Sequence, residues 1–255
     1  MISVVVGSNF MEEALHSLPV GLLQSTIVVV VTLVVRVFIV FLRDKSPGRR
    51  IWNLDRSKST HIVITTGRIR DDNEFTDTVY PAEARAAAEI ELYLRLIYPK
   101  MIVRVTTSEA ATGEDLKGNL IVIGGPNHNR ISRRILDSLV IPFEFGGHDL
   151  VKQDGRRWSA SLDSSGNIER DSGLIVRTNN RFSPSGGSMF LIAGCRTFGC
   201  LIGSRSLVRS DTKRTGKFVK ALTSWAIVVT GDVYEQEVLG VEVSDVTDVK
   251  VVTND

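Results

Sequence analysis

Short apolar runs alternate with amphipathic stretches along most of the 255-residue chain. The apolar runs cover residues 61–67, 101–107, 119–125, 188–194 and 225–231, and the first of them is rich in β-branched residues. Between Pro81 and Pro99, apolar residues recur at the spacing of one helix face. Further helices are predicted over 129–139, from Thr197 onward and at about 211–223. This alternation of strands and helices is typical of α/β proteins.

Strands that are apolar throughout and separated by helices belong in a parallel sheet that is covered on both faces. Residues 140–180 break this pattern because apolar and polar positions alternate there, with turn signals at Asp154-Gly155 and Ser165-Gly166-Asn167. We therefore predict a Rossmann-like α/β domain. Its sheet is expected to be mostly parallel, with helices on both faces and an antiparallel β insertion at 140–180.

Residues 18–42 form a separate apolar segment whose single charge is Arg36. A helix needs roughly 20 apolar residues to cross a bilayer, so this segment predicts one transmembrane helix before the α/β domain. Lys and Arg are concentrated in residues 43–58 and stay on the cytoplasmic side. We expect residues 1–17 outside the cell membrane, 43–58 as a basic juxtamembrane linker and 59–255 as a cytosolic domain.

The segment before the domain also suggests partners. The basic linker at 43–58 is expected to bind anionic lipid. Arg36 is expected to reach the headgroups, and the alternative is that it pairs helices together with Gln24, Ser25 and Thr26 in a homo-oligomer. Arg130, Arg133 and Arg134 lack interleaved aromatic residues, which argues against a nucleic-acid partner. The formal charge of +2 favours no particular partner.

Three predicted strands end in small residues at what should be one edge of the sheet. In an open parallel sheet, ligands bind beyond the carboxyl ends of the strands, where glycine permits close approach and helix N-termini attract anions. The sequence therefore predicts a site for a nucleotide-like or other anionic small molecule. The candidate ligand-binding residues are Thr66, Gly67, Gly124, Gly125, Asn127, Asn129, Gly194, Thr197 and Gly199. One or both asparagines have the simpler interpretation of helix caps.

Known catalytic and nucleotide motifs are missing from the sequence. Residues 194–199 have the glycine spacing of a Walker A loop, but Cys200 and Leu201 replace its lysine and hydroxyl residue. Cys195 and Cys200 are interpreted as buried thiols, and no cofactor or metal is expected. The weak catalytic candidates are His128, Asp71 and Asp72, each with the alternative of an ordinary loop or solvated residue. Glu83 lies in the first turn of the helix that begins at Pro81, and its negative charge is explained by a favourable interaction with the helix dipole.

In outline, residues 60–235 resemble the Rossmann-like nucleotide-sensing domains of the SLOG class in membrane-anchored bacterial signalling and defence proteins. The resemblance is topological and implies a class of ligand, while the hairpins at 140–180 depart from it. We expect a membrane-anchored sensor that binds a nucleotide-like ligand. The alternatives are a membrane-tethered hydrolase or transferase of nucleotides or nucleosides, and a protein-interaction scaffold.

Overall fold

The computed structural model describes residues 47–71, 74–208 and 223–251. The chain divides into two compact units, residues 1–46 and 47–255, and all described elements belong to the second unit. Within this described part, no helix has the length and apolar character needed to cross a membrane. This corrects the predicted fold class, in which a membrane helix precedes the domain; residues 18–42, where that helix was expected, lie outside the described residues. The helix expected at about 211–223 also falls almost wholly outside them.

The main sheet is mixed, which corrects the prediction of a mostly parallel sheet. Its strand order is β14-β13-β11-β12-β5-β1-β4, with β10 on β11 and β15 on β13. The parallel part consists of β4 (Val103–Thr107), β1 (Thr60–Ile64), β5 (Asn119–Ile123) and β12 (Ser188–Gly194). The antiparallel part consists of β11 (Ile168–Asn179), β13 (Trp225–Tyr234), β14 (Glu237–Val238), β15 (Glu242–Asp248) and β10 (Ser161–Leu162).

Strand β11 explains why the predicted β insertion is wrong. Its residues fall within the segment 140–180, but it lies between β12 and β13 inside the main sheet. From Asp171 to Thr178 every residue of β11 is buried, so this strand is a central part of the core. The hairpins predicted for 140–180 are present before it, where β7 (Phe143–Gly146), β8 (Asp149–Lys152) and β9 (Arg157–Trp158) form a small antiparallel sheet.

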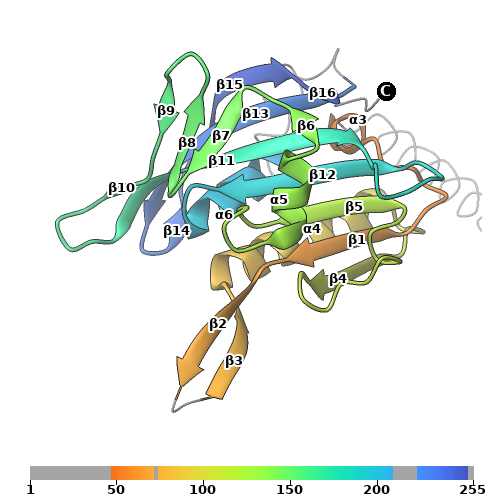
Figure 1. Cartoon of the computed structure of the whole chain (residues 1–255), viewed down its shortest axis with the longest axis horizontal. Helices are drawn as coiled ribbons and strands as arrows, with labels where there is room; N and C mark the ends of the chain where they lie inside the picture. Colours follow the sequence, from red (N-terminus) through yellow and green to blue (C-terminus); the bar gives the residue numbers. More distant parts are fainter. Residues whose placement is uncertain (1–46, 72–73, 209–222, 252–255) are drawn as a thin grey trace, which may run out of the picture. The chain divides into compact units, whose positions relative to one another are not determined.

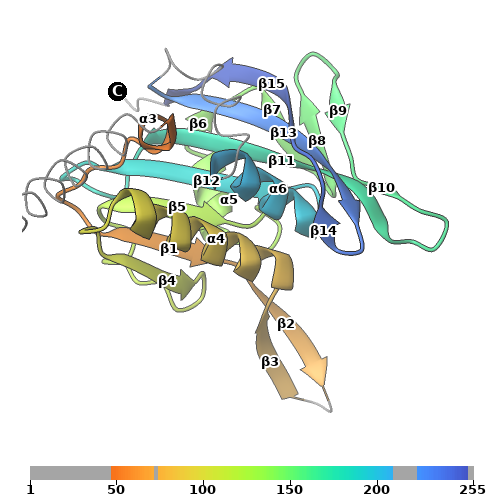
Figure 2. The ribbon, with the colours of Figure 1, turned by 180° about the vertical axis from the view of Figure 1, so that it is seen from behind.

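A hairpin occupies the place where a polar loop was expected after the first strand. Strands β2 (Thr66–Asp71) and β3 (Glu74–Val79) pair with each other in antiparallel register and form a sheet of their own. In both views this ribbon extends away from the end of β1 (Figures 1 and 2). A further two-stranded sheet joins β6 (Leu139–Val140) to β16 (Lys250–Val251).

Helices lie on both faces of the main sheet. Helices α4 (Pro81–Ile97) and α6 (Thr197–Val208) cover one face, and α5 (Arg130–Leu136) covers the other (Figures 1 and 2). The alternation of side chains along β1 and β5 divides the core accordingly. Ile62, Ile64, Ile121 and Ile123 pack with α4 and α6, whereas Val63, Leu120 and Val122 pack with α5 and β7–β8.

The short helix α3 (Pro47–Trp52) belongs to the same folded unit. Its Trp52 is fully buried, and the Trp52 and Phe190 ring centroids lie 4.6 Å apart. Arg49 adds a hydrogen bond from its Nε to the carbonyl oxygen of Ile97 at the end of α4 (2.8 Å). Burial of a tryptophan is worth several kcal/mol, so this contact fixes the start of the domain on the sheet.

Candidate functional site

Three parallel strands end together at one edge of the sheet. Strand β1 lies between β4 and β5, and β5 lies between β1 and β12. In register, Ile64 pairs with Ile123, and Ile123 pairs with Ile192. The turns that follow these residues therefore begin side by side, as the sequence predicts for β1, β5 and β12.

A cavity of about 260 Å³ lies at this edge, and we call it the strand-end cavity. It lies between the start of α4, the turn after β5, the β7–β8 turn, the start of β11 and the turn between β12 and α6. Five of the predicted residues line it, namely Gly125, Asn127, His128, Gly194 and Thr197. The other lining residues are Tyr80, Glu83, Pro126, Phe145, Gly147, His148, Ile168, Cys195, Arg196 and Cys200.

The exposed part of the strand-end cavity carries basic and imidazole side chains. Arg196, His128 and His148 line it and are exposed to solvent. Tyr80 and His128 are close, with ring centroids 6.1 Å apart. The side-chain amide of Asn127 donates a hydrogen bond to the carbonyl oxygen of Gly147 (2.8 Å), which ties the turn after β5 to the β7–β8 turn. The exposed part of the cavity therefore offers a ligand both a positively charged side chain and aromatic rings.

Backbone N–H groups around the cavity divide into two sets. Those of Gly125, Asn127 and Thr197 have no hydrogen-bond acceptor among the residues that the structure describes. In contrast, those of Arg196 and Gly199 donate to the side chain of Asp171 at 3.2 and 2.6 Å. An internal carboxylate thus occupies part of the predicted anion site at the start of α6, and the first set remains for a ligand.

Two of the predicted residues have structural roles beside the cavity. Asn129 is fully buried and caps α5, because its side-chain oxygen accepts from the N–H groups of Ile131 (3.0 Å) and Ser132 (3.2 Å). Gly124 has φ +127°, and a Cβ there would lie 1.7 Å from the Thr65 hydroxyl oxygen. Only glycine fits this turn, for reasons of backbone geometry and packing.

Gly199 also serves packing, since it lets α6 begin directly against the sheet. A Cβ on Gly199 would lie 2.1 Å from the Ser172 carbonyl oxygen and 2.6 Å from the Cα of Gly194. The same close approach excludes a side chain at Gly173, whose Cβ would lie 2.3 Å from the Gly199 carbonyl oxygen. The spacing that resembles a Walker A loop therefore reflects the contact of a helix with two strands.

Replacing Gly199 with alanine should destabilise the protein. The added methyl group meets backbone atoms that cannot rotate away, and overpacking of this kind costs about 1–3 kcal/mol. We expect a loss of about 2–3 kcal/mol in the free energy of unfolding, measured by urea denaturation. Gly113→Ala is the matched control, because a Cβ at Gly113 has no heavy atom within 4 Å. Equal stability of the two variants would contradict this packing role.

Glu83 is the buried acid of the strand-end cavity. It lies in the first turn of α4 with 6% of its surface exposed, and one carboxyl oxygen accepts the backbone N–H of Thr65 (3.2 Å). Among the described residues no Lys, Arg or His forms an ion pair with it. Burial raises the pKa of Glu83 to about 7, against the smaller opposite effect of the Thr65 hydrogen bonds.

Asp171 is a second buried acid, located behind the turn that leads into α6. Burial raises its pKa to about 6, although hydrogen bonds from three backbone N–H groups act in the opposite direction. Burial also raises the pKa of the Cys195 thiol to about 12 and that of Cys200 well above its ordinary value. Both cysteines are buried free thiols, so neither has the thiolate character of a nucleophile at neutral pH.

The remaining predicted residues lie away from the strand-end cavity lining. Thr66 and Gly67 begin β2, and a Cβ on Gly67 would lie 3.0 Å from the Tyr80 hydroxyl oxygen. Asp71 ends β2 at the far end of the hairpin, while Asp72 lies outside the described residues. Within the described part of the chain, no group of three or more His, Cys, Asp or Glu side chains is arranged to hold a metal ion.

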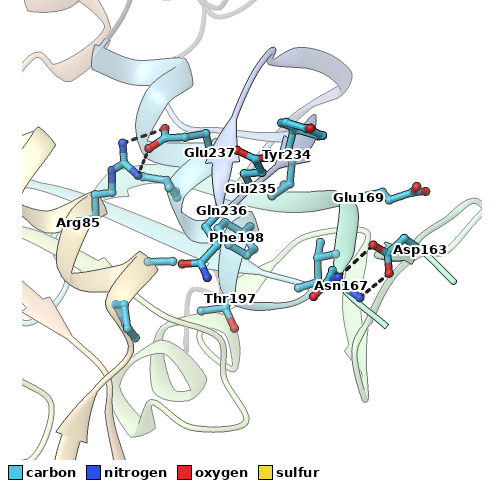
Figure 3. Close-up of a pocket in the computed structure, with 15 residues that line it drawn as sticks. Arg85, Asp163, Asn167, Glu169, Thr197, Phe198, Tyr234, Glu235, Gln236 and Glu237 are labelled. Carbon is cyan, nitrogen blue, oxygen red and sulfur yellow. Dashed lines mark hydrogen bonds and ion pairs between the residues drawn. The ribbon is translucent and has the colours of Figure 1, made fainter. Parts of the chain in front are cut away.

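A larger hollow of about 880 Å³ adjoins the same helix start, and we call it the acidic groove. Figure 3 shows its lining, with Arg85 paired to Glu237 and Asp163 bonded to Asn167. Its carboxylates are Asp163, Glu169, Glu235 and Glu237, and Arg85 is its single basic residue. Thr197 and Ile168 line both hollows. Arg205 also pairs with Glu237, yet the lining keeps an excess of negative charge, which makes the groove less suited to an anion than the strand-end cavity.

Several residues of the site were missed by the sequence prediction. Arg196 and His148 stand beside small residues in the turns "AGCRTFG" and "FGGHD", and this pattern could have marked them. Glu83 was attributed to the helix dipole, and its position two residues after a helix-starting proline carries no sign that it is buried. Asp171 has no local signal at all, because its partners Arg196 and Gly199 lie at least 25 residues away along the chain.

Comparison of the chain with known protein families and with curated proteins finds no match. What the site can do therefore follows from its own geometry and chemistry. That geometry combines a small cavity at parallel strand ends, exposed Arg196 with two histidines, one buried acid, and backbone N–H groups that have no acceptor in the described part of the chain.

Proposed function

We propose that this α/β domain binds a small phosphate-bearing, nucleotide-like molecule in the strand-end cavity and acts as a ligand-responsive sensor. The observation that carries the proposal is that Arg196, His128 and His148 line one cavity together with Gly125 and Thr197, whose N–H groups have no acceptor among the described residues. A guanidinium group and backbone N–H groups are the donors that recognise phosphate in proteins. Tyr80 and Phe145 offer aromatic surface to a planar ring.

The size of the strand-end cavity limits the ligand. Its volume of about 260 Å³ lies just below the range of about 300–1,000 Å³ that is usual for small-molecule sites. A ligand of mononucleotide size or smaller is therefore favoured over a dinucleotide. The acidic groove is larger but repels phosphate, so it does not extend the anion site.

Binding without turnover is favoured over catalysis by the state of the two cysteines. Cys195 and Cys200 line the cavity, but burial keeps both thiols protonated. A sensor needs donors and a shaped cavity, which the site offers, and needs no activated nucleophile.

One observation favours a second candidate function, a hydrolase or transferase. Glu83 lines the cavity, and a carboxyl group with a pKa of about 7 is suited to general acid–base catalysis at neutral pH. Incubation of the full chain with AMP, followed by chromatography, separates the two candidates. Recovery of intact AMP together with an increase in melting temperature supports the sensor, and steady consumption of AMP supports the enzyme.

Arg196 gives the direct test of phosphate recognition. We expect Arg196→Ala to weaken AMP binding about tenfold or more in isothermal titration calorimetry, because a charged hydrogen bond contributes about 1.5–3 kcal/mol. Arg104→Ala is the matched control, since Arg104 is also exposed but lies on β4 and does not line the cavity. The control should bind AMP as tightly as the unaltered protein. Equal affinities of both variants would remove Arg196 from the site.

A further inference from the structure

The strand-end cavity has an uneven distribution of charge. Of the charged or titratable carboxyl, guanidinium and imidazole groups that line it, Glu83 alone is buried, whereas Arg196, His128 and His148 are exposed. The other buried residues that line the cavity are Cys195 and Cys200. Above its pKa of about 7, the ionised Glu83 carboxylate repels a phosphate placed beside it, and the repulsion is strongest where water is excluded. Phosphate therefore belongs at the exposed side of the cavity.

The inner part of the cavity suits a group that donates hydrogen bonds. One Glu83 oxygen already accepts the Thr65 N–H, which fixes the orientation of the carboxyl group. The hydrogen-bond donors to this carboxyl group among the described residues all belong to Thr65, through its backbone N–H and its side chain. A carboxylate has about four acceptor sites, so a hydroxyl or ring N–H of a ligand can still bind to it.

We propose that Glu83 selects the organic part of the ligand, so that the ligand is a nucleoside monophosphate with a ribose hydroxyl or base N–H on Glu83 and its phosphate beside Arg196. This inference rests on the proposed function and adds an orientation and a ligand class to it. Bare phosphate occupies only the exposed side and gains nothing from Glu83. A nucleoside without phosphate reaches Glu83 and loses the contact with Arg196.

Replacing Glu83 with glutamine changes the group that faces the ligand from a hydrogen-bond acceptor to a donor. The new amide must turn its oxygen toward the Thr65 N–H, and its NH₂ group then faces the ligand. The NH₂ group of the variant and the hydroxyl or N–H group of the ligand are both donors, so they cannot form a hydrogen bond with each other. The variant also lacks the negative charge that repels phosphate. We expect the AMP dissociation constant of Glu83→Gln to rise at least tenfold, and the dissociation constant of inorganic phosphate to stay constant or fall.

The test is a calorimetric titration of the full chain with inorganic phosphate, ribose 5-phosphate, adenosine and the four nucleoside monophosphates. The unaltered protein should bind at least one monophosphate at least tenfold more tightly than phosphate, and Glu83→Gln should remove this preference. Glu83→Asp provides a second variant that keeps the acid and should give an intermediate preference. It also keeps the test open if the glutamine variant does not fold.

Two failures remain distinguishable. If neither phosphate nor any monophosphate binds, the proposed function itself is wrong. If a monophosphate binds but both Glu83 variants keep the full preference over phosphate, the site stands and the role of Glu83 is overturned. The groups that titrate around Glu83 are Tyr80, His128, His148, Cys195, Cys200 and, behind the turn, Asp171. All titrations are therefore run at pH 8, above the Glu83 pKa of about 7, with each variant compared with the unaltered protein.

Discussion

Asp171→Ala is expected to lower the free energy of unfolding by about 4 kcal/mol. The Asp171 carboxylate accepts the backbone N–H groups of Ser172 (2.8 Å), Arg196 (3.2 Å) and Gly199 (2.6 Å), and it is fully buried. Each buried donor left without a partner costs about 1–3 kcal/mol. Removing a buried charge offsets part of that loss. Urea denaturation at pH 7 measures the net effect.

The chain offers a matched control for this prediction. Asp163 also accepts two backbone N–H groups, from Ser165 and Asn167 at 2.8 Å, but in an exposed turn. Water replaces the carboxylate there, so Asp163→Ala should cost less than about 1 kcal/mol. Similar losses in the two variants would show that Asp171 does not organise the start of α6. If only Asp171→Ala lowers the stability strongly, AMP binding should be weaker as well. The reason is that Asp171 holds the backbone of Arg196, and the next residue, Thr197, lines the cavity.

The stability of the protein should depend on pH through Glu83. Its pKa is about 7 in the folded protein, above the ordinary value of 4.5 that applies to the unfolded chain. Between pH 4.5 and 7 the folded protein therefore holds a proton that the unfolded chain releases, and the free energy of unfolding falls as pH rises. The expected contribution is about 3 kcal/mol, fully present below pH 4.5 and fully lost above pH 7.

Comparison with Glu83→Gln isolates this contribution from other titrating groups. Burial raises the pKa of Asp171 in the same direction, whereas burial lowers the pKa of His61, which destabilises the protein as pH falls. These groups are common to both proteins. The difference in unfolding free energy between variant and unaltered protein should grow by about 3 kcal/mol from pH 5 to pH 8. A constant difference across this range would contradict the raised pKa of Glu83.

The edge of the sheet that carries the candidate site is predictable from the sequence because its signals are local. β1, β5 and β12 are short apolar runs; glycine follows β1 and β5 within three residues, and β12 ends on Gly194. Glycine turns after parallel strands can only lie at the carboxyl ends, which share one edge. The helices that begin at Pro81 and Thr197 also carry local signals, and the structure places them where expected.

The rest of the fold depends on pairings that local patterns do not reveal. β11 has turn signals before it and reads as one arm of a hairpin, yet its partners β12 and β13 make it central to the sheet. The sequence from Arg68 to Val79 reads as a loop because polar and charged residues predominate in it, and the structure gives it a hairpin. Asp171 acquires its role only through contact with the start of α6.

We propose that the strand-end cavity, and not the acidic groove, receives a phosphate-bearing ligand. The most direct measurement is an NMR titration of the uniformly ¹⁵N-labelled full chain with AMP. We predict that the largest shifts in amide resonances occur at Gly125, Asn127 and Thr197, whose N–H groups have no acceptor in the described part of the chain. Shifts confined to Asp163, Glu235 and Gln236 in the acidic groove, or no shifts with AMP, GMP, CMP, UMP and inorganic phosphate alike, would contradict it.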